Sequence, residues 1–325
     1  MSASVRVGTC SWADDTLTKV WYPRGVRSGE ARIRHYAERF DTVEANSTYY
    51  RLPDAELVGN WAERTPDGFT MHVKAFGLMT RHPVKLESLP EDLRDVMPVD
   101  DRGRVDRPPR ELRAEVFRRF ARAVEPLRER GKLGGILLQF PSYVVYKPAS
   151  LEYIEWAAAQ LPGDDVLVEF RHRSWLDEEN RAQTLSFLES RGLTYVIVDA
   201  PKTDAKNLVP TVVARTSKTA YVRFHGRNAS TWNKRTGSAA ERFDYLYSEQ
   251  ELEEWVEPLQ ELAGESESVY AMFNNNGRSE MPATGLEGLD PEEIAGDPSK
   301  GEVAQAPANA LMLRRALQDA GVPVS

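Results

Sequence analysis

The 325-residue chain has little cysteine, with Cys10 as its only one. A single cysteine excludes an internal disulfide framework and a zinc site built from several cysteines. No apolar run approaches the ~20 residues that a membrane-spanning helix needs. The segment from Met1 to Arg6 lacks the charged flank and apolar core of a signal peptide. We therefore expect a cytoplasmic protein with no membrane association.

An overall excess of positive charge is also missing, because the formal net charge is -8. That balance argues against a generally basic nucleic-acid binder. The acidity is regional, however. Residues 241–302 hold 17 acidic and 3 basic residues, a net of -14, whereas residues 1–240 hold 37 basic and 32 acidic residues, a net of +5. Anionic ligands are therefore not excluded.

Short apolar runs rich in β-branched and aromatic residues alternate with segments of helical period. The predicted strands are residues 5–10, 42–46, 69–76, 134–140, 166–170, 195–199, 221–224 and 269–273. The main predicted helices are residues 29–40, 112–124, 150–161, 179–191, 249–262 and 308–320, with one more beginning near Pro53. Residues 203–216 are irregular where a helix would be expected.

Eight strands in alternation with helices predict a (β/α)8 TIM barrel, an α/β fold, as a single domain over residues 1–325. Two insertions are expected, after strand 3 at about residues 77–109 and after strand 8 at about residues 277–307. A doubly wound open sheet is the alternative. Its dinucleotide-binding forms carry a glycine-rich turn after the first strand, where this chain has only Gly8-Thr9-Cys10-Ser11.

Polar residues recur where the predicted strands end, which is the catalytic end of such a barrel. Residues two apart share a face of a strand, so these polar residues come in pairs. The series is Ser11, Glu44 with Asn46, His72 with Lys74, Gln139, Glu169 with Arg171, Asp199, Arg223 with His225, and Asn274 to Asn276. Structural ion pairs such as Glu44–Arg223 would explain single members. The whole series predicts a ligand site, although His72, in mid-strand, is expected to be a hydrogen-bonded core residue.

The same residues favour an anion over a metal ion. Glu44, Glu169, Asp199 and His225 offer oxygen and nitrogen ligands, but no ligand pair has a diagnostic helical spacing. Lys74, Arg171 and Arg223 would repel a cation and attract phosphate or carboxylate. We expect no resident metal, and the sequence leaves any cofactor unknown. Aromatic residues near the strand ends suit stacking on sugar rings or nucleobases: Trp12, Trp21, Tyr22, Tyr49, Tyr50, Tyr143 and Trp175.

Several of these stretches resemble the domain of unknown function 72 family (DUF 72, the YecE-like proteins). They are residues 7–12, 40–53, 69–74, 138–141, 168–175, 221–226 and 273–275. The resemblance covers nearly the whole chain and implies a TIM barrel with a polar pocket and no established reaction. Similar barrels include sugar isomerases and endonuclease-IV-like enzymes. The chain departs from the pattern at Cys10-Ser11, where Ser-Gly is common, and in the long acidic insertion before Asn309.

The leading hypothesis is an enzyme, a hydrolase or isomerase, that acts on a small anionic or phosphorylated, sugar-containing substrate by acid–base chemistry. Glu44 or Glu169 is the expected acid or base, with His225 as proton partner. The expected substrate-binding residues are Asn46, Lys74, Gln139, Arg171, Asp199, Arg223 and Asn274. A Schiff-base role for Lys74 is a lesser alternative.

Two alternatives come from other functional classes. Residues 77–132 hold 14 basic and 11 acidic residues, which suggests nucleic-acid binding or endonuclease-IV-like phosphodiester chemistry. A non-catalytic scaffold would instead use the acidic helix at residues 249–267 to bind a basic partner.

Overall fold

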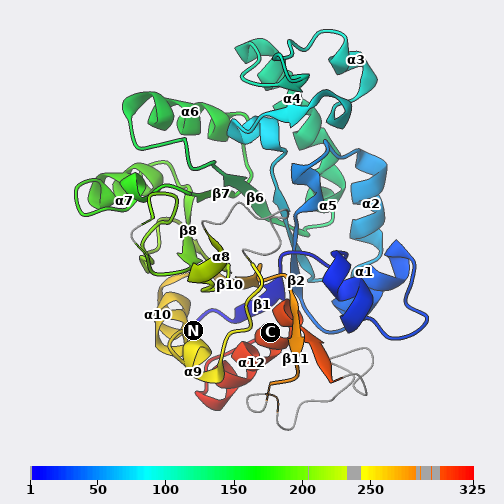
Figure 1. The fold of residues 1–325 in the computed structure, drawn as a ribbon, viewed down its shortest axis with the longest axis vertical. Coiled ribbons are helices and arrows are strands. Elements are labelled where there is room, and N and C mark those ends of the chain that lie inside the picture. The colour runs from blue at the N-terminus through cyan, green and yellow to red at the C-terminus, as the bar shows by residue number, and fades with distance from the viewer. Residues whose placement is uncertain (1, 204, 233–242, 283–285, 287–293, 295–300) are drawn as a thin grey trace.

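Eight parallel strands close into a barrel in the order β1-β10-β9-β8-β7-β6-β3-β2 (Figure 1). The strands are β1 (Val5–Thr9), β2 (Thr42–Ala45), β3 (Thr70–Lys74), β6 (Leu133–Gln139), β7 (Val166–Glu169), β8 (Thr194–Asp199), β9 (Thr219–Phe224) and β10 (Ser268–Phe273). The computed structural model describes residues 2–325 except 204, 233–242, 283–285, 287–293 and 295–300. The predicted (β/α)8 fold is confirmed.

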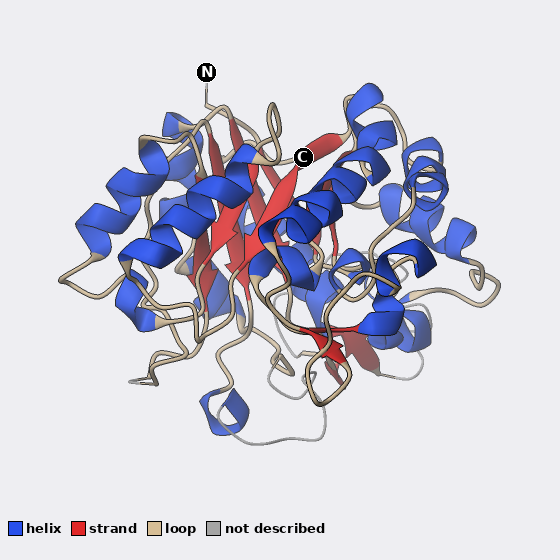
Figure 2. Cartoon of the chain, turned by 90° about the horizontal axis from the view of Figure 1, so that it is seen from above, coloured by secondary structure: helices blue, strands red, loops and turns tan. Residues whose placement is uncertain are grey.

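Helices surround the barrel, as Figure 2 shows. The longer ones are α1 (Gly29–Ala37), α2 (Ala55–Glu63), α4 (Arg110–Ala123), α5 (Glu125–Glu129), α6 (Pro148–Ala159), α7 (Arg181–Glu189), α9 (Glu249–Glu253), α10 (Val256–Glu265) and α12 (Gln305–Asp319). Several of them bury a stripe of apolar residues. In α4, for example, Val116, Phe117 and Phe120 are buried. Burial of such stripes against the sheet supplies most of the driving force for this layered architecture.

The structure refines two predicted helices. The acidic helix expected at residues 249–262 is divided into α9 and α10. Pro258 lies in the first turn of α10 and has no N–H to donate to Glu254, so one unbroken helix would lack that hydrogen bond. Between β8 and β9 the described residues form no helix, in agreement with the irregular pattern of residues 203–216.

Two small antiparallel hairpins lie outside the barrel. The segment between β3 and α4 contains β4 (Val84–Lys85) paired with β5 (Arg104–Val105), and the short helix α3 (Glu91–Arg94). After β10, β11 (Arg278–Glu280) pairs with β12 (Glu302–Ala304). Most of the chain that connects β11 to β12, within the insertion expected at 277–307, lies outside the described residues.

The barrel interior is filled by polar and aromatic side chains. Near its amino-terminal end, Arg6 Nη1 donates a hydrogen bond to Thr70 Oγ1 at 2.5 Å. His72 lies above, with its ring centroid 4.7 Å from that of Tyr221 and 4.3 Å from that of Tyr270. His72 is a core residue as expected, but its ring nitrogens have no hydrogen-bond partner among the described residues. These side chains fill the barrel toward the amino-terminal ends of its strands. Within the described barrel, a ligand site can therefore form only at the carboxyl ends of the strands.

Candidate active site

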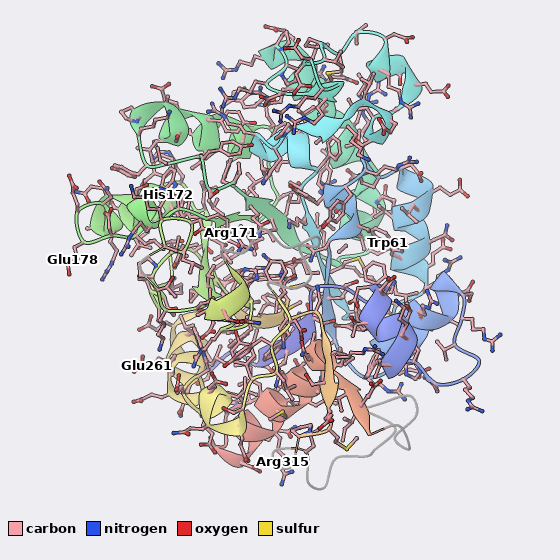
Figure 3. The ribbon with its side chains drawn as sticks, viewed as in Figure 1. Trp61, Arg171, His172, Glu178, Glu261 and Arg315 are labelled. Carbon is pink, nitrogen blue, oxygen red and sulfur yellow. The ribbon has the colours of Figure 1, made fainter. Side chains whose placement is uncertain are left out.

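A cavity of about 770 Å³ opens at the carboxyl ends of the strands, the end at which barrel enzymes carry their chemistry. Figure 3 places Arg171 near the centre of the molecule, whereas Glu178, Glu261 and Arg315 lie at its edge. The polar lining residues are Ser11, Asp14, Asn46, Ser47, Lys74, His82, Gln139, Ser142, Arg171, Asn207, Asn274 and Asn276. Trp12, Tyr49, Tyr50 and Phe243 are the aromatic lining residues.

The structure divides the predicted site residues into two groups. Those that line the cavity are Asn46, Lys74, Gln139, Arg171 and Asn274. Those that do not line it and are almost completely buried are Glu44, Glu169, Asp199, Arg223 and His225. We expected the residues of the second group to contact a ligand directly. In this geometry they lie beneath the cavity lining and do not reach the cavity.

Arg223 is the centre of a buried ion network beneath the cavity. Its Nη2 lies 2.7 Å from Glu44 Oε1, and its Nη1 pairs with Glu169 Oε2. The hydroxyl of Tyr221 donates to Glu44 Oε2 at 2.9 Å. Both terminal nitrogens of Arg223 thus face carboxylates, which corrects the expectation that Arg223 holds an anionic ligand. Opposite charges at this range offset the cost of burying each group.

Glu169 connects this network to the cavity lining. Arg171 Nε lies 2.5 Å from Glu169 Oε1, and Gln139 Nε2 donates to the same oxygen at 2.9 Å. Although burial opposes ionisation, the positive charges of Arg171 and Arg223 hold the pKa of Glu169 well below its ordinary value. A carboxylate held ionised in this way orients Arg171 rather than exchanging protons with a ligand.

A chain of hydrogen bonds and polar contacts connects Asn46 to His225. Asn46 Nδ2 donates to the carbonyl of Cys10 at 2.7 Å and lies 3.3 Å from Asn274 Oδ1. Asn274 Nδ2 lies 3.0 Å from His225 Nδ1. His225 Nε2 lies 3.1 Å from both Glu169 Oε1 and Arg171 Nη2.

The environment of His225 favours its neutral form. Burial and the nearby Arg171 lower its pKa to about 3. The imidazole is enclosed and has no face on the cavity. It supports Glu169 and Asn274 instead of serving as the proton partner that the sequence suggested.

Asp199 faces away from the cavity. Arg227 Nη2 lies 2.7 Å from its Oδ2, the Tyr247 hydroxyl donates to Oδ1 at 2.7 Å, and Trp255 Nε1 donates to Oδ2 at 2.9 Å. These contacts hold the segment after β9 and the start of α10 against β8. Asp199 therefore has its partners within the protein, and its assignment to substrate binding stays a prediction that these contacts do not support.

Lys74 is the cation of this site that lacks a carboxylate partner among the described residues. Its Nζ lies 4.5 Å from the centroid of the Tyr49 ring, a cation–π contact. Burial and the neighbouring Arg223 and Arg171 lower the pKa of Lys74 to about 8, against the opposing pull of Glu44 and Glu169. The inner site thus holds three cations, Lys74 included, against two carboxylates.

Lining residues that were not predicted from the sequence include Asp14, His82, Asn207 and Phe243. They lie on irregular segments after a strand or in an insertion, where no period marks them. Asp14 Oδ1 accepts from the backbone of Thr16 and Leu17 at 2.8 and 3.1 Å, while its Oδ2 is buried without a partner in the described structure. Burial raises the pKa of Asp14.

The predicted aromatic residues also divide into two groups. Trp12, Tyr49 and Tyr50 line the cavity, whereas Trp21, Tyr22 and Trp175 are buried in the core. Tyr143 follows Ser142 of the lining and remains half exposed. Cys10 is a buried residue as expected, and burial raises the pKa of its thiol well above the ordinary value.

No group of three or more His, Cys, Asp or Glu side chains among the described residues is arranged to hold a metal ion. None of the helices described is both long and apolar enough to span a bilayer.

Comparisons with known proteins agree with this fold. The chain is 30% identical over 291 residues to the UPF0759 protein YunF of Bacillus subtilis, with 88% of this chain and 94% of YunF covered. It is 28% identical to the UPF0759 protein YecE of Escherichia coli K12, with 66% and 74% covered.

Two solved structures of DUF72 family proteins are similar over 97% of this chain. The protein from Enterococcus faecalis is 23% identical, with 95% of that chain covered and a TM-score of 0.73. The protein from Thermotoga maritima is 30% identical, with 99% covered and a TM-score of 0.70. Residues 6–287 match the family model described as "Protein of unknown function DUF72". The chain belongs to the DUF72 family.

Proposed function

We propose that this protein is an enzyme whose strand-end cavity binds a small anionic, sugar-like molecule. The observation that carries the proposal is Lys74, whose ammonium group borders the cavity with no carboxylate partner in the described chain. Burial of an unpaired charge is costly unless a ligand or solvent compensates it. A phosphate or carboxylate on the ligand would supply that compensation.

Arg171 provides the second contact for the anion. Its Nε lies 2.5 Å from Glu169 Oε1 and its Nη2 lies 3.1 Å from His225 Nε2, and the side chain also lines the cavity. With Arg171 and Arg223 balanced by Glu44 and Glu169, the charge of Lys74 remains in surplus. A ligand with a single anionic group matches that surplus.

Polar and aromatic lining residues suit a hydroxylated ligand. Asn46 Oδ1 is a buried acceptor that has no partner among the described residues, and it borders the cavity. A ligand hydroxyl would satisfy it. Trp12, Tyr49 and Tyr50 offer ring faces of the kind that stack on sugar rings. These features favour a sugar phosphate or sugar acid over an apolar anion.

Asp14 is the carboxyl group that we assign to acid–base chemistry. It borders the cavity, its Oδ2 is unpartnered in the described structure, and its pKa is raised by burial. A raised pKa favours the protonated carboxyl, the form that can donate a proton to a ligand. Glu44 and Glu169, the candidates from the sequence, are enclosed and paired with Arg223.

Titration calorimetry with sugar phosphates and the matching neutral sugars tests the proposal. The phosphorylated ligand is expected to bind, and Lys74→Met to weaken its binding by about 10- to 100-fold, the loss of one charge-assisted hydrogen bond. Lys218→Met is the matched control, because Lys218 is exposed and precedes β9 at the opposite end of the barrel. Equal binding of both ligands, or no effect of Lys74→Met, would contradict the proposal.

A nucleic-acid ligand is a second candidate. The guanidinium groups of Arg81 and Arg113 lie 4.0 and 5.3 Å from the Tyr153 ring, without carboxylate partners in the described structure. Tyr143, whose hydroxyl donates to the Arg81 carbonyl at 2.6 Å, is exposed beside them. Binding of a DNA or RNA oligonucleotide that falls steeply with salt and is lost in Arg81→Ser/Arg113→Ser would favour this candidate.

A further inference from the structure

We propose that Lys74 is a nucleophile that forms an imine with the carbonyl group of the bound ligand. This inference rests on the proposed function and narrows its ligand to an anionic aldehyde or ketone, such as an open-chain sugar phosphate. Three features of the site support it: the position of Lys74, its lack of a carboxylate partner and its charged neighbours.

The first feature is the position of Lys74 in the barrel. Lys74 is the last residue of β3, so its side chain starts from a rigid element at the carboxyl end of the barrel and borders the cavity. The preceding residue of the same strand face, His72, is packed in the core between Tyr221 and Tyr270. The backbone at Lys74 is also tied down, because its carbonyl accepts from the Thr48 hydroxyl at 2.5 Å. A nucleophile needs this kind of fixed origin.

The second feature is the absence of a competing partner. A structural lysine in this chain has a different environment: Lys132 Nζ donates to the carbonyls of Ala62 and Thr65 at 2.7 and 2.6 Å. Lys74 Nζ has no such acceptor among the described residues, only the face of Tyr49 at 4.5 Å. Its nitrogen is therefore available to a ligand.

The charged neighbours supply the third feature. The groups that act on Lys74 are Arg171 and Arg223, which disfavour its protonation, and Glu44 and Glu169, which favour it. His82, which also lines the cavity, is held neutral, with a pKa lowered to about 3. With the pKa of Lys74 at about 8, roughly a quarter of the amine is free at pH 7.5, against about one part in a thousand for an ordinary lysine.

The reaction balances without any further reagent. The nitrogen lone pair of the neutral amine attacks the carbonyl carbon, a C–N bond forms, and the carbonyl oxygen takes up a proton. The resulting carbinolamine loses that hydroxyl group together with a proton from nitrogen, as one molecule of water, to give the imine. Hydrolysis reverses both steps. The imine, once protonated, withdraws electrons from the adjacent carbon and so promotes proton removal there.

Reductive trapping with a matched pair of ligands tests the inference. Glyceraldehyde 3-phosphate carries the carbonyl group, and glycerol 3-phosphate lacks it but keeps the phosphate. Wild-type protein is incubated with glyceraldehyde 3-phosphate and sodium cyanoborohydride, and adducts are mapped by peptide mass spectrometry. We expect Lys74 to be modified at least tenfold faster than Lys218 of the same molecule, and glycerol 3-phosphate to slow the modification of Lys74 alone.

Modification of Lys74 no faster than Lys218 would overturn the inference. Calorimetry with glycerol 3-phosphate separates that failure from a failure of the proposed function, because anion binding that depends on Lys74 would persist. Lys74→Arg provides a second readout that keeps the positive charge. We expect this variant to bind glycerol 3-phosphate within a few fold of wild type. It should form no adduct with glyceraldehyde 3-phosphate at residue 74. If wild-type protein neither forms the Lys74 adduct nor binds glycerol 3-phosphate, both proposals are contradicted.

Discussion

Arg223 and Glu44 form an enclosed ion pair within the barrel, with Nη2 2.7 Å from Oε1 and neither side chain exposed. The same guanidinium pairs with Glu169, so one cation compensates two carboxylates. The pair decides the architecture of the site. It holds Glu44 beneath the cavity, and through Glu169 it positions Arg171 at the cavity surface.

Replacement of Arg223 by methionine is expected to lower the free energy of unfolding by about 3–5 kcal/mol, because two buried carboxylates lose their compensating charge. Urea unfolding followed by circular dichroism measures the change. The combined variant Glu44→Gln/Arg223→Met is expected to recover part of the loss, since one uncompensated charge is then removed. A loss below about 1 kcal/mol in Arg223→Met would show that the network does not support the barrel.

Stability is expected to fall as the pH drops below about 6.5, partly through His72. Burial lowers the pKa of His72 to about 3 in the folded protein, whereas the unfolded chain has an ordinary value near 6.5. The unfolded state therefore takes up a proton first, and the stability present above pH 6.5 is lost progressively between about 6.5 and 3. His72→Met should flatten the pH dependence between pH 6 and 4 by up to about 1.4 kcal/mol per pH unit. An unchanged slope in urea titrations would contradict this assignment.

Sulfate affinity is expected to report the protonation of Lys74. Sulfate keeps its charge across the range, so its affinity should be level below about pH 7.5. Above about pH 8, where Lys74 loses its proton, the affinity should fall by about tenfold per pH unit. Lys74→Arg should move that fall to higher pH, because a guanidinium stays charged. Lys74→Met should bind sulfate weakly and without the step. Calorimetry from pH 6 to 10 distinguishes the three profiles.

Lys132 is expected to matter for stability and not for ligand binding. Its Nζ donates to the carbonyls of Ala62 and Thr65 and so satisfies the carboxyl-terminal end of α2. Lys132→Met removes both of these hydrogen bonds to buried carbonyls, at a cost of about 1–3 kcal/mol. Thermal unfolding should show the loss, while Lys218→Met should stay within about 0.5 kcal/mol of wild type. A change in sulfate affinity in Lys132→Met would contradict the purely structural role.

Several features of this protein could be predicted from its sequence. Alternation of β-rich and helical periods predicts the barrel, because a parallel strand must be followed by a crossover that returns the chain to the other end. Polar residues at strand ends predict the end that carries the cavity. The period of two also paired Glu169 with Arg171 and Arg223 with His225 on common faces, and both pairs lie together in the structure.

The tertiary structure alone decided which of those residues reach the cavity. Period two gives the face of a strand, but depth within the barrel depends on the stagger of the strands and on the side chains that close over them. Arg223 and Glu169 therefore lie beneath the surface that Arg171 and Lys74 reach. Asp199 meets Arg227, Tyr247 and Trp255 because of packing between elements that are far apart in sequence. Asp14 and Asn207 lie on irregular segments without a period, so only the folded chain could place them at the cavity.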